Sequence, residues 1–400
     1  MDNLLFLVHR IPYPPNKGDK IRSFHFLKHL SEHFNVYLGA FIDDADDLAY
    51  INTVKQYCSD VNLVSINPTW RTVMSAKGLF TGSSLSVPYY DVGSMHSWVG
   101  STIQDNQIKK VFLFSSVMAQ FITKHEGLDV IADFVDIDSD KWRQYAEKKA
   151  WPISWVYTRE SKYLLGFEKA IAKKYRQVLF VSKKEADLFN RLSGGLKTID
   201  YVNNGVDIDY FTPSKNFLNP YKKDETAIVF TGAMDYWANV DAVVWFVDNV
   251  LPELLANNMN VMFYIVGSKP SSIVKELQAH QNVTVTGRVE DMRPFIQGAD
   301  VIVAPLRIAR GIQNKVLEAM AMGKAVVASP QAMEGIDAET SGIRVADSPS
   351  QFSNAIFEML KLADYEPSNR AFVETEFSWI ESGNKLVSII QNTTLPKESL

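Results

Sequence analysis

Short β-rich runs alternate with segments of helical periodicity along the chain, and this alternation restricts the fold more than any other feature. Strand, helix and strand in succession build parallel sheets with covering helices. In the first half we expect strands at 3–8, 35–41, 61–66, 111–115, 130–135 and 178–181, and helices at 19–33, 140–150 and 154–174. In the second half we expect strands at 227–231, 261–266, 283–286, 301–304 and 325–328.

The alternation is interrupted by a polar stretch at 203–220 that contains turn-forming Asn, Gly and Pro. Because 400 residues fit two domains better than one, we expect an α/β domain on each side of it. The expected boundaries are an N-terminal domain at 1–205, a linker at 206–222, a C-terminal domain at 223–375, and a C-terminal helix within 376–400 that packs back on the first domain.

Composition excludes several classes of protein. The net charge of −5 and the pI near 5.9 give no general attraction to nucleic acid, so an anionic ligand needs a local group of cations. Cys58 is the only cysteine, which rules out an internal disulfide or a multi-thiolate metal site and favours a reducing compartment. The apolar run at 4–8 is too short for a signal peptide, so we expect a cytoplasmic protein.

The strongest local pattern is at 301–329, which is typical of a strand, a glycine-containing loop, a helix, a glycine stop and a second strand. Such a loop presents backbone N–H groups and the positive end of a helix, where a diphosphate is favoured. Arg310 and Lys315 add cations there, and Glu318, one turn into the helix, can accept hydrogen bonds from a ribose diol. The alternative is an ordinary amphipathic helix with Lys315 and Glu318 on its solvated face.

This segment resembles the donor-binding segment of glycosyltransferase family 4, whose members have the GT-B fold and retain anomeric configuration. Other stretches resemble further marks of that family, in the same order: the loop at 12–18, the inter-domain signature at 203–213, the first strand and loop of the C-terminal domain at 230–239, and the nucleobase segment at 286–293. More narrowly, 12–22, 136–142 and 304–315 together resemble the sugar transferases of exosortase-linked (PEP-CTERM) exopolysaccharide clusters.

The resemblance implies an α/β protein of the GT-B fold, with two doubly wound Rossmann-like domains facing a central cleft. It implies a retaining transfer of a sugar from a nucleotide-diphosphate-sugar donor to a polysaccharide or lipid-linked acceptor. No metal or other cofactor is expected, because basic side chains offset the charge of the leaving diphosphate. The residues assigned are Arg310, Lys315 and Asp136 for catalysis, Gly18, Gly232, Arg288, Val289, Gly311, Ile312, Gln313, Asn314 and Glu318 for the donor, and Asp138 for the acceptor.

The sequence departs from the family at two places. Many members carry two glutamates eight positions apart, but Arg310 stands eight residues before Glu318, which predicts different sugar contacts or extra neutralisation of phosphate. The basic residue usual after Gly232 is replaced by the acidic and aromatic run at 235–237. No catalytic role is assigned to the histidines, since a departing phosphate can take the acceptor's proton; those considered are His9, His25 and His125.

Three alternatives stay open. Asp136, Asp138 and Asp140 form overlapping Asp-x-Asp patterns, which could hold a divalent cation, although we favour contacts of Asp136 and Asp138 with the acceptor or sugar. Ser139 or Asp140 could instead cap a helix.

A sugar-nucleotide 2-epimerase would share the fold, and a non-catalytic nucleotide-sugar-binding protein would keep the donor site without turnover.

The segment 141–176 is strongly basic, with ten Lys or Arg against three acids, and it includes Trp142, Trp151 and Trp155. It could rest on an anionic bilayer and present a lipid-linked acceptor, which would make the protein peripheral to the inner membrane. It could equally be a solvated helical face with its tryptophans in the core. The sequence leaves both interpretations open.

Overall fold

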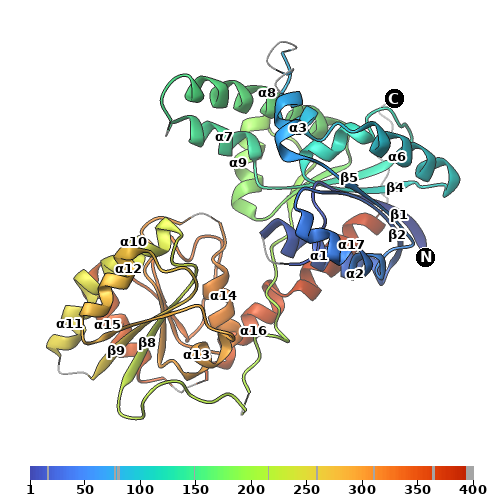
Figure 1. Cartoon of the computed structure of the whole chain (residues 1–400). Helices are drawn as coiled ribbons and strands as arrows, with labels where there is room; N and C mark the ends of the chain where they lie inside the picture. The colour runs from blue at the N-terminus through green and yellow to red at the C-terminus, as the bar shows by residue number, and fades with distance from the viewer. Residues whose placement is uncertain are drawn as a thin grey trace. The chain divides into compact units, whose positions relative to one another are not determined.

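The computed structural model describes all residues except 16–17, 76–77, 79–81, 148, 215, 258–259, 310, 363–364 and 393–400. The chain divides into two compact units (Figure 1). Unit 1 comprises Met1–Asn204 together with Ser382–Leu400, and unit 2 comprises Gly205–Glu381. The stretch 206–222, expected as a linker, falls within unit 2 in this division.

Unit 1 is built on a parallel sheet with the strand order β3-β2-β1-β4-β5-β6-β7. The order reverses direction between β1 and β4, which is the arrangement of a doubly wound domain. The strands are β1 (Asp2–Val8), β2 (Phe34–Ile42), β3 (Asp60–Ser65), β4 (Lys110–Phe114), β5 (Asp129–Val135), β6 (Gln177–Phe180) and β7 (Ile199–Tyr201).

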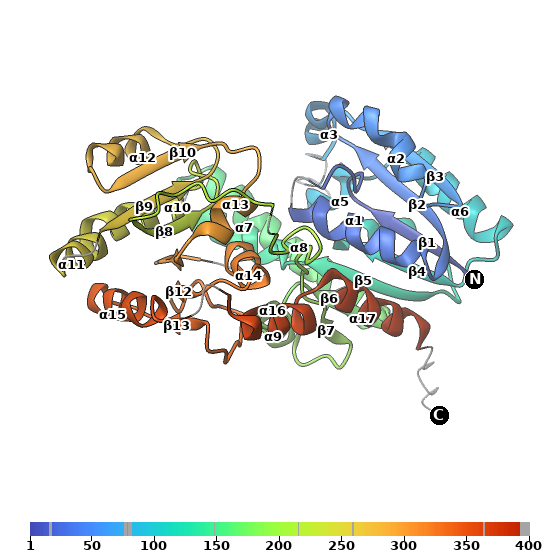
Figure 2. The same cartoon turned by 90° about the horizontal axis from the view of Figure 1, so that it is seen from below.

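Helices cover both faces of this sheet (Figures 1 and 2). The long pair α7 and α8 lies side by side within unit 1. The helical segments are α1 (Gly18–Ser31), η1 (Ala45–Tyr50), α2 (Ile51–Lys55), α3 (Pro68–Ser75), α5 (Ser86–Tyr89), α6 (Gly93–Asp105), η2 (Ser116–Phe121), α7 (Asp138–Glu147), α8 (Ile153–Lys174) and α9 (Lys183–Ser193).

Unit 2 repeats the architecture with the parallel order β10-β9-β8-β11-β12-β13, which reverses between β8 and β11. Its strands are β8 (Thr226–Thr231), β9 (Val261–Val266), β10 (Val283–Gly287), β11 (Val301–Ala304), β12 (Val326–Ala328) and β13 (Ile343–Val345). Its helical segments are α10 (Trp237–Trp245), η3 (Phe246–Val250), α11 (Leu251–Ala256), α12 (Ser272–Glu276), η4 (Leu277–Ala279), α13 (Arg293–Gly298), α14 (Asn314–Ala321), α15 (Pro349–Met359) and α16 (Pro367–Glu376) (Figure 2). Two Rossmann-like domains are therefore confirmed.

The apolar runs that predicted the strands are buried on both faces. Leu4, Leu5, Phe6 and Leu7 of β1 have no exposed surface, and every residue of β11 is buried. Parallel strands covered by helices on both sides read as continuous apolar runs for this reason. Each such side chain contributes about 1.5–3 kcal/mol of burial free energy.

The last helix, α17 (Trp379–Gln391), returns the chain to unit 1. Asn384 Oδ1 lies 3.1 Å from His29 Nε2 of α1, and Ser382 Oγ donates to the carbonyl oxygen of Asn203 at 2.8 Å. Arg176 Nη2 donates to the carbonyl oxygen of Ile389 at 2.8 Å. These bonds fasten the end of the chain across the first unit. No helix among the described residues is both long and apolar enough to cross a membrane.

A fully buried ion pair joins α1 to β5 at the carboxyl edge of the unit 1 sheet. Arg22 Nε donates to Asp133 Oδ2 at 2.8 Å, and neither side chain has exposed surface. Arg22 Nη1 also donates to Asn204 Oδ1 at 2.9 Å, and its guanidinium lies 4.6 Å from the centre of the Phe26 ring. Burial raises the pKa of Asp133, although the charge of Arg22 opposes that shift.

We expect Arg22→Met to lower the free energy of unfolding by about 3–5 kcal/mol, because it leaves the Asp133 carboxylate buried without a counter-charge. Chemical denaturation followed by far-UV circular dichroism measures the loss. The control is Arg143→Met, which removes an exposed guanidinium bonded to Asp140 and Glu147 and should cost no more than about 1 kcal/mol. Equal losses in the two variants would show that the buried pair carries no special weight.

Candidate functional site

The carboxyl edge of the unit 2 sheet has a switch point between β8 and β11. Loops that follow the two strands leave toward opposite faces of the sheet, so a crevice forms where ligands bind in doubly wound domains. Gly232 follows β8 directly, and the loop after β11 leads through Gly311 to α14. The predicted donor segment therefore lies at the switch point of its sheet.

Lys315 connects the two sides of this switch point. Its Nζ donates to Asn239 Oδ1 of α10 at 2.6 Å and lies 4.1 Å from the centre of the Phe230 ring of β8. A Cβ atom on Gly232 would lie only 3.0 Å from Lys315 Nζ and 2.7 Å from Asn239 Nδ2. Gly232 thus makes room for an ammonium group that comes from α14 and is held beside β8.

Lys315 and Glu318 are three residues apart on α14 and are poorly solvated. Desolvation lowers the pKa of Lys315 to about 7, and the charge of Glu318 opposes this shift. Burial likewise raises the pKa of Glu318 to about 7 against the charge of Lys315. Both groups titrate near neutral pH as a coupled pair. Such perturbed groups at a sheet edge are a common mark of a functional site.

Gly311 has φ +65°, a left-handed conformation that glycine adopts without strain. Gln313, at the N-cap position of α14, turns its side chain back and donates from Nε2 to the Gly311 carbonyl oxygen at 3.0 Å, instead of capping the helix. Ile312 packs against Gly335, and Asn314 is exposed. This turn leads into the amino end of α14, whose first amides suit an anion. Arg310, the predicted cation of the same loop, lies outside the described residues.

Arg288 and Val289 follow β10, which is separated from β8 by β9. Arg288 is exposed, and Val289 is half-buried against the core of unit 2. They share the carboxyl edge with Gly232 but lie two strands away from it. The structure therefore gathers Gly232, Gly311, Gln313, Lys315 and Glu318 at the switch point and leaves these two at its margin.

Unit 1 has its own switch point, between β1 and β4, and His9 follows β1 there. His9 Nε2 lies 3.3 Å from Asp19 Oδ2 of α1, and its ring is stacked on Phe114 with the centroids 6.0 Å apart. His9 Nδ1 is buried and has no hydrogen-bond partner within the described part of the chain. Arg10 bonds both Asp19, at 2.7 Å, and Asp43, at 2.7 Å.

Charge and backbone strain concentrate at this second edge. Burial would raise the pKa of Asp19, but the hydrogen bond from His9 and the charge of Arg10 hold it well below its usual range. Ser115, directly after β4, has φ +78°, and Val135, at the end of β5, has φ +68°. Non-glycine residues in this conformation persist mainly at functional sites. His9 was assigned no catalytic role from the sequence, and this cluster was not predicted; only the position of His9 after a central strand pointed to it.

The predicted residues of unit 1 lie along the same edge. Gly18 begins α1, and a Cβ there would meet nothing within 4 Å, so packing does not require the glycine. Asp136 and Asp138 both bond Lys141 Nζ, at 2.9 and 3.2 Å. Their carboxylates share an ammonium group, and the described residues contain no group of three potential ligands that could hold a metal ion.

Glu168 of α8 binds the start of α7. It accepts hydrogen bonds from Ser139 Oγ at 2.5 Å and from the Ser139 backbone N–H at 3.3 Å, in a fully buried position. Burial raises the pKa of Glu168 to about 8. Ser139 therefore helps to fasten α7 to α8, next to Asp136 and Asp138.

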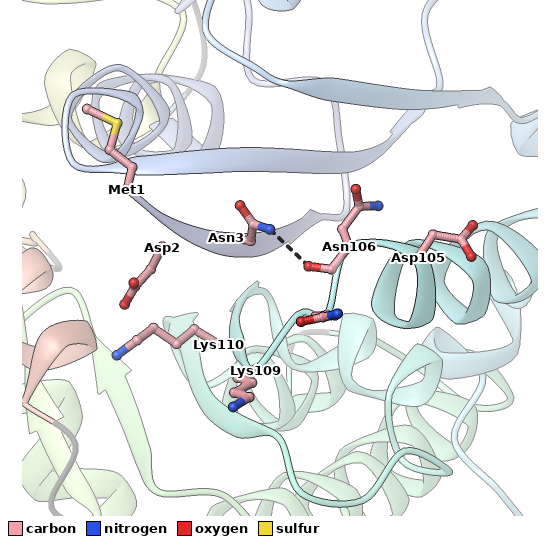
Figure 3. A pocket seen from close by; sticks show the side chains of 8 residues that line it. Met1, Asp2, Asn3, Asp105, Asn106, Lys109 and Lys110 are labelled. Carbon is pink, nitrogen blue, oxygen red and sulfur yellow. Dashed lines mark hydrogen bonds between the residues drawn. The ribbon is translucent and has the colours of Figure 1, made fainter.

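A cavity of about 550 Å³ opens at the opposite, amino edge of the unit 1 sheet (Figure 3). Asn3 Nδ2 donates there to the Asn106 carbonyl oxygen at 2.9 Å, and Lys109 and Lys110 flank the opening. Ligands of doubly wound domains bind beyond the carboxyl ends of the strands. This cavity is therefore not the candidate site.

Comparison with known proteins finds a family match within unit 2. Residues 225–362 match the family described as "Glycosyl transferases group 1". Over this stretch the chain is similar to group 1 glycosyltransferases. The stretch contains β8 to β13 and hence Gly232, Gly311, Lys315 and Glu318.

One curated relative is the GDP-mannose-dependent monoacylated alpha-(1-6)-phosphatidylinositol monomannoside mannosyltransferase of Corynebacterium glutamicum, 27% identical over 241 residues. The aligned stretch covers 53% of this chain and 61% of that relative.

Solved structures match almost the whole chain and confirm the GT-B fold. Sucrose-phosphate synthase from Thermosynechococcus elongatus matches with a TM-score of 0.67 and 17% identity, over 97% of this chain and 98% of that one. HepE from Anabaena, in complex with UDP and glucose, matches with a TM-score of 0.62 and 15% identity, over 97% of this chain and 99% of that one.

We expect Lys315 to react with an amine-acylating reagent with a pH midpoint of about 7, because desolvation favours its neutral, nucleophilic form. Peptide mass spectrometry after brief labelling over a range of pH measures that midpoint. In Glu318→Gln the midpoint should fall further, because the carboxylate charge that raises the pKa of Lys315 is gone. A midpoint near the usual value for lysine, or a rise in Glu318→Gln, would contradict the described electrostatics.

Proposed function

We propose that the protein is a retaining, metal-independent glycosyltransferase that moves a sugar from a nucleotide-diphosphate-sugar to a polysaccharide or lipid-linked acceptor. The bond between the anomeric carbon and the diphosphate oxygen breaks, and a bond from that carbon to an acceptor hydroxyl oxygen forms on the same face. The acceptor's proton passes to the departing nucleoside diphosphate. No oxidant, reductant or additional base is required.

The observation that carries the proposal is the ammonium group of Lys315 at the switch point between β8 and β11. Its hydrogen-bond partner Asn239 is a neutral amide, so a bound phosphate would supply the counter-charge that keeps this poorly solvated group protonated. The turn at Gly311 and the amino end of α14 supply backbone amides beside it. Arg310, in the same loop of the sequence, is proposed as a second cation for the diphosphate. Glu318 is proposed to accept from the ribose hydroxyls, and Arg288 and Val289 to border the nucleobase.

Metal independence is supported by the contacts of the two aspartates that could have bound a cation. Partial desolvation opposes the charged form of Lys141, but its bonds to Asp138 and Asp136 raise its pKa. Replacing that ammonium with a divalent ion would require breaking both bonds. We propose instead that Lys315 and Arg310 offset the charge that develops on the leaving diphosphate.

The acceptor is proposed to bind in unit 1, at the carboxyl edge that carries Gly18, Asp136 and Asp138. The strained residues Ser115 and Val135 lie along this edge and support a functional role for it. The resemblance of 12–22, 136–142 and 304–315 to transferases of exopolysaccharide clusters favours an exopolysaccharide or its lipid-linked precursor. The curated relative is named for a lipid acceptor, which agrees with this class.

We expect Lys315→Met and Glu318→Ala each to weaken nucleotide-sugar binding by about 10- to 100-fold, the cost of about 1.5–3 kcal/mol for a lost hydrogen bond to a charged group. Titration calorimetry against a panel of nucleotide sugars measures this loss of affinity. Lys361→Met, which removes an exposed lysine that follows the end of α15 in unit 2, is the control and should bind normally. Unchanged affinity in both site variants would show that the donor binds elsewhere.

A metal chelator should leave turnover unchanged, and the product should keep the donor's anomeric configuration.

The helical pair α7 and α8 supports a peripheral position on the cytoplasmic face of a membrane. Trp151 is 80% exposed and Trp155 is 55% exposed, so these two tryptophans do not lie in the core. Trp142 differs, since it is half-buried and its ring lies 5.0 Å from that of Tyr157. Lys149 is exposed beside Trp151. Exposed aromatics with lysines are typical of a surface that enters the headgroup region of an anionic bilayer.

We expect the double variant Trp151→Ala, Trp155→Ala to bind vesicles that contain phosphatidylglycerol about tenfold more weakly than the unmodified protein, because it loses apolar area at the interface. Vesicle sedimentation measures the partition. Trp237→Ala, which removes a 50% exposed tryptophan from unit 2, should bind the same vesicles normally. If the double variant binds the vesicles as strongly as the unmodified protein, the two tryptophans belong to a solvated helical surface and not to a membrane-binding one.

A further inference from the structure

A hollow of about 620 Å³ lies on unit 2 along one side of α10, apart from the residues proposed to bind the donor. Trp237, the first residue of α10, lines one end, and Trp245, the last, lines the hollow further along. Ile273 of α12 and Arg307 from the loop after β11 also contribute to its wall. The hollow therefore extends along a helix instead of ending in a single enclosed pocket.

Its apolar surface is formed by the rings of Trp237 and Trp245 together with the aliphatic side chains of Val240, Val244 and Ile273. Trp237 is 50% exposed, and Ile273 is 53% exposed. Trp245 is half-buried and is fixed by an edge contact with Phe352, with the ring centroids 5.5 Å apart. The two tryptophans are eight residues apart on one side of the helix, so about 12 Å of helix axis separates them. That span is longer than a single sugar ring.

The polar groups of the hollow are placed by other contacts. Arg307 Nε donates to Asp241 Oδ2 at 2.9 Å, and Arg307 Nη2 bonds the other oxygen of the same carboxylate. This two-bond arrangement holds a planar donor group and a planar acceptor group at the rim. Asp248 and Asn249 add a carboxylate and an amide at the far end. Such groups accept from and donate to hydroxyls in fixed directions.

Charge selects among the ligands that this surface could take. The described residues that line the hollow include three carboxylates, of Asp235, Asp241 and Asp248, and one guanidinium, of Arg307. Lys269 Nζ lies 3.8 Å from Asp235 Oδ2 and offsets one of these carboxylates, so the hollow has no excess of positive charge that would attract phosphates, nucleotides or anionic lipid headgroups. Flat aromatic surface combined with fixed hydrogen-bonding groups and no positive excess fits an uncharged polyhydroxylated chain.

The hollow shares two loops with the proposed donor site. Asp235 lies three residues after Gly232, and Arg307 lies four residues before Gly311, so the same two loops contribute to both places. We infer that the hollow along α10 binds the sugar chain of the acceptor, as a subsite for an uncharged oligosaccharide. This inference rests on the proposed glycosyl transfer, and it assigns to unit 2 a share in acceptor selection.

The test titrates the full-length protein calorimetrically with uncharged oligosaccharides of increasing length, first selected on a glycan array. Binding should strengthen with chain length until the chain spans Trp237 and Trp245. Trp237→Ala should weaken binding of the longer chains by about tenfold, which corresponds to about 1.4 kcal/mol, and Trp237→Phe should recover most of it. Asp241→Asn should also weaken binding, whereas Trp70→Ala, which removes a 60% exposed tryptophan from α3 of unit 1, is the control and should have no effect.

Donor binding is measured on the same preparations and separates the possible failures. If the protein binds a nucleotide sugar but no oligosaccharide, or if oligosaccharide affinity is the same in Trp237→Ala and Asp241→Asn as in the unmodified protein, the subsite is wrong and the proposed transfer stands. If no nucleotide sugar binds, the proposed transfer fails whatever the glycan result. Should Trp237→Ala fold poorly, Trp237→Phe and Asp241→Asn still decide the question.

Discussion

The hydrogen bond between Lys315 and Asn239 connects the fold of unit 2 to its chemistry. Lys315 belongs to the helix after β11, whereas Asn239 belongs to the helix after β8, and the two meet because β8 and β11 are neighbours at the switch point. The ammonium group of Lys315 lies against the ring of Phe230 and close to Gly232, where it is poorly solvated. Desolvation makes the charged form of Lys315 costly, so a phosphate that supplies a counter-charge gains more there than at an exposed lysine.

Most of the fold could be predicted from the sequence because strands buried on both faces read as unbroken apolar runs. The run at 301–304 coincides with β11, and 261–266 coincides with β9. The short strands β7 and β13 were not predicted, because a charged residue, Asp200 or Arg344, interrupts each of them, whereas the equally short β12 is entirely apolar. Hydrogen-bonding partners far apart in sequence were also beyond reach. Asn239 is 76 residues from Lys315, and only the strand order brings them together.

The site was predictable where its members are close in sequence. Gly311, Gln313, Lys315 and Glu318 occupy one turn and the start of one helix, so their proximity follows from local geometry. Residues whose role depends on packing were harder to judge. His9 looked like any isolated histidine, yet it follows a central strand and bonds Asp19. The exposure of Trp151 and Trp155 depends on where α7 and α8 lie in unit 1, which no pattern of residue types specifies.

Arg307 lies near the start of the loop after β11 and Lys315 just beyond its end, and their surroundings differ. This difference distinguishes their roles. The guanidinium of Arg307 is bonded to the carboxylate of Asp241, so a phosphate would have to displace an existing counter-ion. The nearest hydrogen-bond partner of Lys315 is a neutral amide, and its neighbour Glu318 is itself largely desolvated. A dianionic ligand is therefore favoured beside Lys315 and disfavoured beside Arg307. A hydroxyl group can instead hydrogen-bond to both Arg307 and Asp241 without separating this ion pair. The same loop can thus hold an anionic donor at one end and present an uncharged chain with fixed donors and acceptors at the other.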